Sequence, residues 1–329
     1  MGALRRAPRS HFKGFGTMTS AVPTPNISVM IATRNRRNEL HETLTKLAQL
    51  DPKPVEILIC ADGSTDDTVE MLRNEFPDLK VIENKTKLGS VASRDKMLRL
   101  ALGEIVVSLD DDSYPIDPDF ISQLQLAFQA HPSAAVITFA ELRGKEATLA
   151  GPSADLTRGQ FVAAYPNCAA AMRRSLYGVR AKFPLIFEHM YEEPDYALQC
   201  YAAGFGVWFE PSLQVRHYLT STQREPISRH HRNARNELWS VVLRCPFPWI
   251  IFVALYRIVR QLAFAMSQGM SWMIREPVWW LAALRGWREV IAQRRHVPWC
   301  VYRTWMHLNR KAVRDEVELR QMLAGESSM

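Results

Sequence analysis

Three consecutive carboxylates, Asp110, Asp111 and Asp112, follow an apolar run at residues 105–109. A short apolar run rich in β-branched residues predicts a buried strand of an α/β sheet. Three neighbouring acids repel one another unless a cation or hydrogen-bond donors neutralise them. Carboxylate oxygens are ligands that Mg²⁺ and Mn²⁺ prefer, and Mg²⁺ sites often include substrate phosphates. A solvated acidic turn that caps the next helix is the alternative interpretation.

Acidic residues also follow a second apolar run and precede a later helical pattern. Asp62-Gly63-Ser64 comes directly after the apolar residues 55–60, although these residue types also form ordinary turns. Glu192-Glu193-Pro194-Asp195 stands at the start of a helical pattern, where proline is compatible with the first turn. A carboxylate at that place can act as a general base. Acidic residues also favour a helix N-terminus through the helix dipole alone.

Strand and helix patterns alternate along residues 26–222. We predict strands at residues 27–33, 55–60, 79–82, 104–109, 134–140, 161–172 and 207–209, helices between the first four strands and after Asp119, Arg173 and Pro194, and a loop at 142–160. Such alternation is typical of a parallel, doubly wound α/β sheet. Because the crossovers of such a sheet are right-handed, the acidic and polar strand ends share one edge, where ligands bind.

The same residues resemble the motifs of a known family. Thr33-Arg34-Asn35-Arg36, Asp62-Gly63-Ser64-Thr65-Asp66, Leu109-Asp110-Asp111-Asp112 and Glu192-Glu193-Pro194-Asp195 follow one another as in family 2 glycosyltransferases with the GT-A fold. The resemblance covers residues 27–220. It implies an α/β catalytic domain of the GT-A type at residues 26–222, with a mostly parallel sheet flanked by helices and an α-helical extension at residues 223–329. It also implies a nucleotide-diphosphate sugar as the donor.

The resemblance implies roles for individual residues. Nucleotide-sugar contacts are implied for Thr33, Arg34, Asn35, Asp62, Arg94, Asp110 and Asp111, and ligands of a divalent cation, Mn²⁺ or Mg²⁺, for Asp110, Asp112 and His217. Asp62 matches the acid that contacts the base, and Arg94-Asp95 the pair near ribose and diphosphate. Asp110 and Asp112 match the outer acids of the DXD motif. A lone histidine such as His217 is equally compatible with a structural role.

Glu193 matches the position of the catalytic base. The family usually has aspartate there, so Glu192 and Asp195 remain candidates for catalytic residues as well. A positioned carboxylate can take the proton of an acceptor hydroxyl, while a cation and arginines stabilise the departing nucleotide. One base opposite the leaving group predicts transfer with inversion.

Composition excludes several other classes of protein. The chain has 329 residues, 47% hydrophobic and 23% charged, which is ordinary for a globular protein. Its five cysteines form no CxxC pair, so they indicate neither a disulfide framework nor a zinc site and fit the cytoplasm. Residues 1–25 are basic and lack the apolar core of a signal peptide, so we expect a disordered segment with Met18 as an alternative start.

The last third of the chain is basic and rich in tryptophan. Residues 216–329 carry a net charge of +10 and eight of the nine tryptophans. Arg257 and Arg260 interrupt the apolar residues 249–266, and the remaining run is too short to span a bilayer. Aromatic residues beside arginines are typical of helices on anionic lipid. We therefore predict peripheral contact with the inner face of the cell membrane and a lipid-linked or cell-surface glycan as acceptor. Packing into a helical subdomain or an oligomer is the alternative.

Two other functions are compatible with parts of the sequence. A sugar-phosphate nucleotidyltransferase would carry a glycine-rich loop after its first strand, whereas Thr33-Arg34-Asn35-Arg36-Arg37 has no glycine. A non-catalytic membrane-surface protein is compatible with the basic tail. Converging acids do not help to bind a polyanion, so no nucleic acid is expected as a partner.

Overall fold

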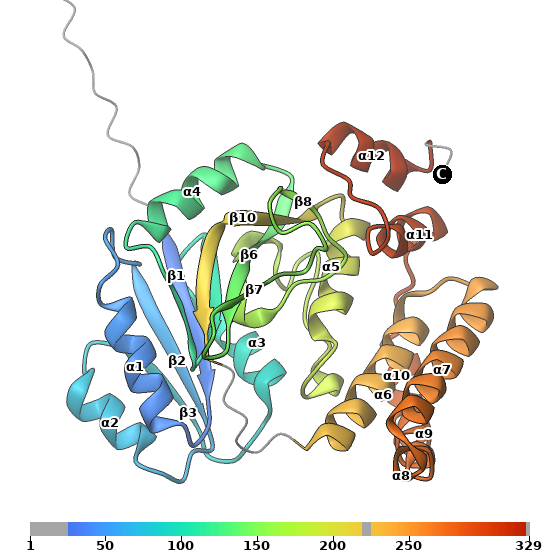
Figure 1. Cartoon of the computed structure of the whole chain (residues 1–329), viewed down its shortest axis with the longest axis horizontal. Coiled ribbons are helices and arrows are strands. Elements are labelled where there is room, and N and C mark those ends of the chain that lie inside the picture. The colour runs from blue at the N-terminus through green and yellow to red at the C-terminus, as the bar shows by residue number, and fades with distance from the viewer. Residues whose placement is uncertain (1–25, 219–224, 327–329) are drawn as a thin grey trace, which may run out of the picture.

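The computed structural model describes residues 26–218 and 225–326. Figure 1 shows an α/β part built on one large sheet and a group of C-terminal helices packed along one side of it. The predicted N-terminal segment 1–25, with Met18, lies outside the described residues.

One mixed sheet forms the centre of the α/β part. Its strands are β1 (Ile27–Thr33), β2 (Glu56–Asp62), β3 (Lys80–Asn84), β4 (Ile105–Asp110), β5 (Ser113–Pro115), β6 (Ala134–Arg143), β7 (Thr148–Ala150), β8 (Gln160–Phe161), β9 (Ala170–Arg173) and β10 (Gly206–His217). They lie in the order β3-β2-β1-β4-β9-β6-β10-β5, with β7 on β6 and β8 on β10. The strands β3, β2, β1 and β4 are parallel, as are β6 and β10, and β9 joins the two groups as an antiparallel strand. The predicted α/β class with a mostly parallel sheet is confirmed.

Helices cover the sheet and continue into the C-terminal part. The α/β part contains α1 (Arg37–Leu47), α2 (Thr68–Glu75), α3 (Ser90–Leu100), α4 (Phe120–Ala130) and α5 (Glu192–Ala202), with short 3₁₀ turns at Asn167–Ala169, Arg174–Leu176 and Leu185–Phe187. The C-terminal part contains α6 (Pro226–Arg244), α7 (Trp249–Gln268), α8 (Met270–Met273), α9 (Glu276–Arg285), α10 (Trp287–Ala292), α11 (Trp299–His307) and α12 (Glu316–Ala324). Strands β1 and β4 are buried along almost their whole length because helices cover both faces of the sheet.

Two predicted strands have different bounds in the structure. The predicted strand 161–172 is wrong as one element, since β8 ends at Phe161 and β9 begins only at Ala170. Between them the chain turns at Pro166, which has no backbone N–H for a ladder, and into a 3₁₀ turn. The predicted strand 207–209 is too short, because β10 continues past Pro211 through a register shift between Glu210 and Gln214 and reaches His217.

Buried ion pairs join the helical part to the α/β part. The carboxylate of Asp195 on α5 accepts hydrogen bonds from the guanidinium of Arg244 and the hydroxyl of Ser240, both on α6. On the next helix, Arg257 and Arg260 both contact the buried Glu237 of α6. The arginines that interrupt the apolar run of α7 therefore point inward to α6.

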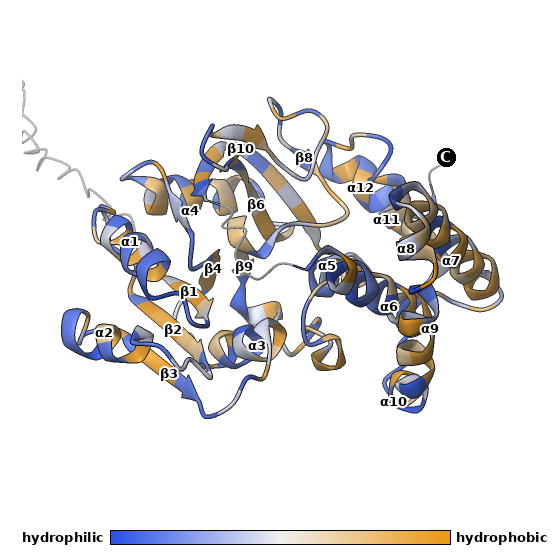
Figure 2. Cartoon of the chain, turned by 60° about the horizontal axis from the view of Figure 1, so that its bottom comes forward, coloured by the Kyte–Doolittle hydropathy of each residue, from blue (hydrophilic) through white to orange (hydrophobic). Residues whose placement is uncertain are grey.

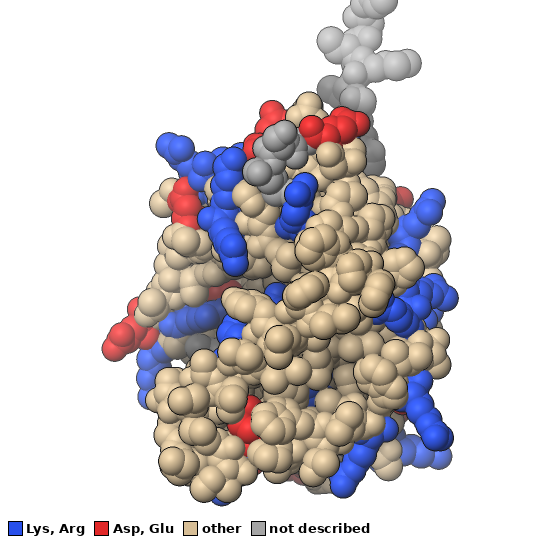
Figure 3. Space-filling model, turned by 90° about the vertical axis from the view of Figure 1, so that its right-hand side faces the viewer, with Lys and Arg blue, Asp and Glu red and all other residues tan. Residues whose placement is uncertain are grey.

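The outer face of α7 is apolar and exposed. Phe252, Leu255 and Val259 recur at helical spacing on it and are 64%, 61% and 55% exposed. Figure 2 shows α7 as mostly hydrophobic, and Figure 3 shows that this side of the molecule has a broad area with few charged atoms and Lys and Arg at its margins. Length and composition alone would let this 20-residue helix cross a membrane. Arg257 and Arg260 lie within that helix, so the prediction that the uninterrupted apolar run is too short to span a bilayer stays a prediction.

Candidate active site

The acids that end β4 are held by residues from β1 and α1. Thr33, the last residue of β1, donates its hydroxyl to Asp111 Oδ2 at 2.8 Å. Arg36 lies 2.7 Å from Asp111 Oδ1 and 2.7 Å from Asp112 Oδ2. Burial raises the pKa of Asp111 to about 7 even though Arg36 lowers it. Asp111 and Thr33 therefore anchor the strand ends to one another, and only Asp110 of the three acids lines a cavity described below.

A separate cavity of about 540 Å³ lies over the ends of β1 and β2. Asp62 lines it and accepts hydrogen bonds from the backbone N–H groups of Leu88 and Gly89, each at 2.8 Å. Gly89 has φ +97°, and a Cβ there would lie 2.5 Å from the carbonyl oxygen of Glu188, so only glycine fits. Thr33 and Arg34 also line this cavity, whereas Asn35 holds the neighbouring turn by accepting from the N–H of Thr65.

Arg94 and Asp110 form a buried ion pair beside the acidic start of α5. Arg94 on α3 is 5% exposed and donates to Asp110 Oδ1. The charges of Asp110, Glu192 and Glu193 together raise the pKa of Arg94 against the effect of burial. A cation at this position stabilises negative charge that would otherwise be isolated from water.

His217, at the end of β10, faces the same acids. Its Nε2 atom lies 3.4 Å from Asp112 Oδ1 and 4.0 Å from Asp110 Oδ2, and no hydrogen bond within the described residues satisfies it. Its Nδ1 atom lies 2.8 Å from the carboxylate of Glu141, on the adjacent strand β6. Burial lowers the pKa of His217, but Asp112, Glu141 and Asp110 raise it to about 9. Burial raises the pKa of Glu141, but hydrogen bonds from His217 and Arg143 lower it to about 2.

This arrangement fits a divalent cation. Ligand atoms of Asp110, Cys168 and His217 lie within 4.8 Å of one another. The unsatisfied Nε2 atom of His217 points at two carboxylates, and a Glu141 hydrogen bond to the other ring nitrogen is the usual way to fix a ligating histidine. Carboxylate oxygen and imidazole nitrogen are suitable for Mn²⁺, whereas the thiol of Cys168 is a softer group that burial keeps protonated by raising its pKa.

Glu192 and Glu193 occupy the first turn of α5. Asn167 donates to Glu192 Oε1 at 3.2 Å. Burial raises the pKa of both carboxyls, and the charge of Glu192 raises that of Glu193 further. A carboxylate with a raised pKa is a stronger proton acceptor than a solvated one, which a general base requires.

These groups meet in one cavity of about 640 Å³. Its lining includes Asp110, His217, Arg94, Glu192 and Glu193. His189 and Arg229 line both this cavity and the one that holds Asp62, so the two cavities adjoin. The structure thus gathers the first, second and fourth strand ends with the start of α5, as the sequence predicted.

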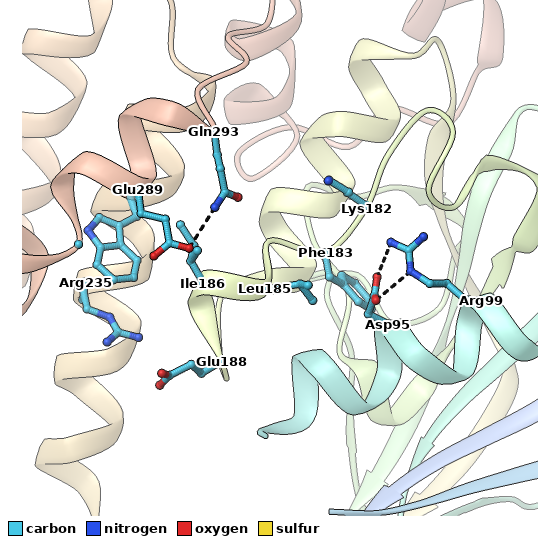
Figure 4. A pocket seen from close by; sticks show the side chains of 12 residues that line it. Asp95, Arg99, Lys182, Phe183, Leu185, Ile186, Glu188, Arg235, Glu289 and Gln293 are labelled. Atoms are coloured by element: carbon cyan, nitrogen blue, oxygen red, sulfur yellow. Dashed lines mark hydrogen bonds and ion pairs between the residues drawn. The ribbon is translucent and has the colours of Figure 1, made fainter. Parts of the chain in front are cut away.

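Two residues from the predicted motifs lie elsewhere. Asp195 is 0% exposed and bound by Arg244, and it is not among the residues that line the cavity of Glu193. Asp95, next to Arg94, turns away into a different cavity of about 610 Å³, where it pairs with Arg99 (Figure 4). The side chains in Figure 4 come from α3, α6, α10 and the segment before α5, and none of the three strand-end acids is among the residues that line this cavity.

Several residues of the site were missed in the sequence. No role was predicted for Arg36 from the sequence, yet its guanidinium forms ion pairs with Asp111 and Asp112. Glu141 directly follows the predicted strand 134–140, so the strand-end argument used for Asp62 could have identified it. Asn167, Cys168 and His189 come from irregular segments, for which the sequence contains no periodic signal.

Comparison with known proteins agrees with the geometry. Residues 28–177 match the family model described as glycosyl transferase family 2. This region of the chain belongs to that family. A β-1,3-glucosyltransferase of Escherichia coli, WfaP, named as acting on α-D-GlcNAc-diphosphoundecaprenol, is 30% identical over 100 residues, which cover 30% of this chain and 39% of that protein. A GalNAc(5)-diNAcBac-PP-undecaprenol β-1,3-glucosyltransferase of Campylobacter jejuni is 34% identical over 92 residues, 27% of this chain and 30% of that protein. The matched region spans well under half of either relative.

Solved structures share the fold of this chain. TarS residues 1–349 from S. aureus superpose with a TM-score of 0.58 at 17% identity, covering 91% of this chain and 90% of that one. A mannosyltransferase of Pyrobaculum calidifontis, in complex with GDP-Man and Mn²⁺, gives 0.53 at 19% identity and covers 93% and 87%. The fold of the chain is therefore GT-A, followed by C-terminal helices.

Proposed function

We propose that this chain is a metal-dependent, inverting glycosyltransferase that moves a sugar from a nucleotide-diphosphate sugar to an acceptor hydroxyl. One observation carries the proposal: Glu193, Asp110 and His217 line a single cavity that adjoins the cavity of Asp62. The cavity of Glu193 contains a carboxylate base and candidate metal ligands for sugar transfer. The cavity of Asp62 lies at the ends of two parallel strands, where a nucleotide would bind.

Within this proposal Glu193 is the general base. It removes the proton of the acceptor hydroxyl as that oxygen bonds to the anomeric carbon, and the bond to the nucleotide diphosphate breaks on the opposite side of the sugar. Glu192 keeps the pKa of Glu193 raised. Arg94 contributes a fixed positive charge close to where the diphosphate leaves.

Asp110, Asp112 and His217 would hold the divalent cation. Mn²⁺ or Mg²⁺ bound there supplies Lewis-acid stabilisation of the charge on the leaving diphosphate. Mn²⁺ is present in a solved mannosyltransferase with this fold, which supports the assignment.

A lipid-linked acceptor and peripheral membrane contact complete the proposal. The two relatives described above are named for diphosphoundecaprenol and PP-undecaprenol acceptors. The exposed apolar residues of α7 would enter the membrane interface, while the Lys and Arg side chains at the margin of this apolar face would meet anionic headgroups. The cytoplasmic face of the membrane, predicted from the sequence, stays a prediction.

The test compares Glu193→Gln with the unaltered chain. We expect this variant to bind its donor with unchanged affinity, measured by thermal shift with a panel of UDP-, GDP- and dTDP-sugars and Mn²⁺. Transfer to prenyl-diphosphate-linked monosaccharides should fall by roughly 10²–10⁴-fold, because the general base is lost.

Glu70→Gln is the matched control, since Glu70 lies in the first turn of α2 and is exposed. Its transfer rate should equal that of the unaltered chain. Transfer by Glu193→Gln at the unaltered rate would show that another residue is the base.

A further inference from the structure

A groove of about 750 Å³ lies between α6, α7 and α8, outside the site described above. Its volume falls within the roughly 300–1,000 Å³ of small-molecule sites. Most of its surface is apolar and comes from Met190, Phe264 and Trp272. Phe264 is 46% exposed and packs edge-on against Trp272, so these two rings form the apolar wall of the groove.

The polar part of the groove is cationic. Arg229 and Arg260 line it together with the amides of Asn233, Gln261 and Gln268, and its lining contains no carboxylate. Arg260 does bond to Glu237, which lies beneath the groove. Glu237 also forms an ion pair with Arg257 and accepts a hydrogen bond from Gln261. One carboxylate therefore pairs with two arginines, and this group of three charges has a net charge of +1.

The groove continues into the catalytic cavity. Met190, Arg229 and Asn233 line both spaces. Met190 lies two residues before Glu192, and Asn233 is on α6 between the two cavities. A molecule in the groove can therefore extend from the acids that perform the proposed transfer to the rings of Phe264 and Trp272.

We propose that this groove binds the lipid diphosphate of the acceptor, with the diphosphate at Arg229 and Arg260 and the first isoprenoid units against Phe264 and Trp272. The proposal rests on the proposed function, since it names the substrate class of the same site. Arginine matches diphosphate oxygens in charge and in geometry. The apolar rings of Phe264 and Trp272 match the hydrocarbon of an isoprenoid, and the shared lining of Met190, Arg229 and Asn233 connects that part of the groove to the cavity of Glu193.

The experiment measures binding of farnesyl diphosphate, a water-soluble short isoprenoid diphosphate, to the full chain by calorimetry and by the fluorescence of Trp272 and its neighbours. Farnesol and inorganic pyrophosphate are the comparison ligands, because each carries half of the chemistry. We expect farnesyl diphosphate to bind at least tenfold more tightly than either. Arg260→Gln and Phe264→Ser should each weaken it at least fivefold, since neither residue lines the cavity of Glu193 or that of Asp62.

Phe252→Ser is the matched control for non-specific partitioning, because Phe252 is on α7 and 64% exposed but outside the groove. It should leave the affinity for farnesyl diphosphate unchanged. Equal affinity for the three ligands, or full affinity in both groove variants, would overturn the proposal.

The outcome is separable from that of the proposed function. Release of nucleotide diphosphate from the donor should be the same in Phe252→Ser as in the unaltered chain. If the donor is cleaved and the groove variants bind farnesyl diphosphate normally, the acceptor site is wrong and the enzyme assignment stands. If the unaltered chain does not cleave the donor but the groove binds farnesyl diphosphate as expected, the enzyme assignment is wrong and the isoprenoid-diphosphate site stands.

Discussion

At the scale of single residues, the pair of His217 and Glu141 makes a prediction about metal binding. Burial lowers the pKa of His217, but Asp112, Glu141 and Asp110 raise it to about 9, so the ring carries a proton at neutral pH that it must lose to act as a ligand. Affinity for Mn²⁺ should therefore rise with pH by about tenfold per unit up to pH 9. Calorimetry in two buffers of different ionisation enthalpy should show about one proton released at pH 7.

Two variants serve as controls for this prediction. Glu141→Gln removes a hydrogen bond that raises the pKa of His217, so affinity for Mn²⁺ should stop rising at a lower pH. His217→Gln should remove the dependence on pH and weaken binding. A dependence that persists in His217→Gln would assign the released proton to another group.

Residues of the site differ in how far the sequence could identify them. Asp62, Asp110 and Glu193 follow or precede periodic elements, and their types alone indicate acid chemistry. Arg36 also follows a periodic element, the strand β1. An arginine in a turn is usually solvated, however, so its contact with the buried Asp111 is visible only in the folded structure. Asp195 was predicted as a candidate catalytic residue because it belongs to the acidic motif, but in the structure its carboxylate is paired with Arg244.

At the scale of elements, the segment before α5 depends on α6. Three of its residues, Glu188, Met190 and Tyr191, adopt left-handed conformations with φ of 61°, 74° and 69°. Asn236 on α6 is 0% exposed, and its amide nitrogen lies within 3.0 Å of the carbonyl oxygens of Phe187, His189 and Met190. Such conformations persist only where the surroundings hold them, so the C-terminal part positions Glu192 and Glu193.

Asn236→Ala tests this dependence. The change leaves buried carbonyls without a donor, which should cost about 1–3 kcal/mol of stability, measured by thermal or urea unfolding. Because Glu193 is displaced from its productive position, kcat should fall by about 10²-fold while the KM for the donor changes little. Asn38→Ala on the exposed surface of α1 is the control and should change neither quantity. An unchanged kcat in folded Asn236→Ala would refute the positioning role.

Elements were predicted best where the chain is periodic. The strands from β1 to β4 and the helices between them match the prediction because both their apolar spacing and their turn residues agree. The prediction of one strand at residues 161–172 was wrong because part of this segment is an irregular turn that packs into the core. Its buried side chains, such as Ala163 and Tyr165, give it the same apolar composition as a strand. Burial alone thus does not distinguish a strand from a packed turn.

At the scale of the whole molecule, composition indicated a separate C-terminal part but not how it joins the rest. The described part of the basic, tryptophan-rich tail, residues 225–326, does form helices beside the GT-A domain, as Figure 1 shows. Some of their tryptophans are buried, such as Trp279 and Trp305, whereas others are exposed, such as Trp280 and Trp287. The two interpretations of the tail, internal packing and membrane contact, therefore apply to different side chains of the same helices.

The apolar face of α7 makes the prediction that concerns the whole chain. An exposed patch of this kind is unusual for a protein that stays in water. Vesicles with anionic lipid at low salt should carry the full chain upward in a flotation gradient, and about 0.5 M salt should reduce this because the arginines are screened. Replacing Phe252, Leu255 and Val259 together by serine should lower the bound fraction at least tenfold, since each loses roughly 1.5–3 kcal/mol of apolar burial at most.

The matched control replaces Leu102, Leu126 and Val179 by serine, because these residues are 66%, 62% and 78% exposed but lie on the α/β part. Flotation of this variant should equal that of the unaltered chain, which separates a specific face from general surface hydrophobicity. If both triple variants float equally, or if the unaltered chain stays at the bottom and forms dimers through α7, the exposed face serves contact between subunits and the membrane assignment is wrong.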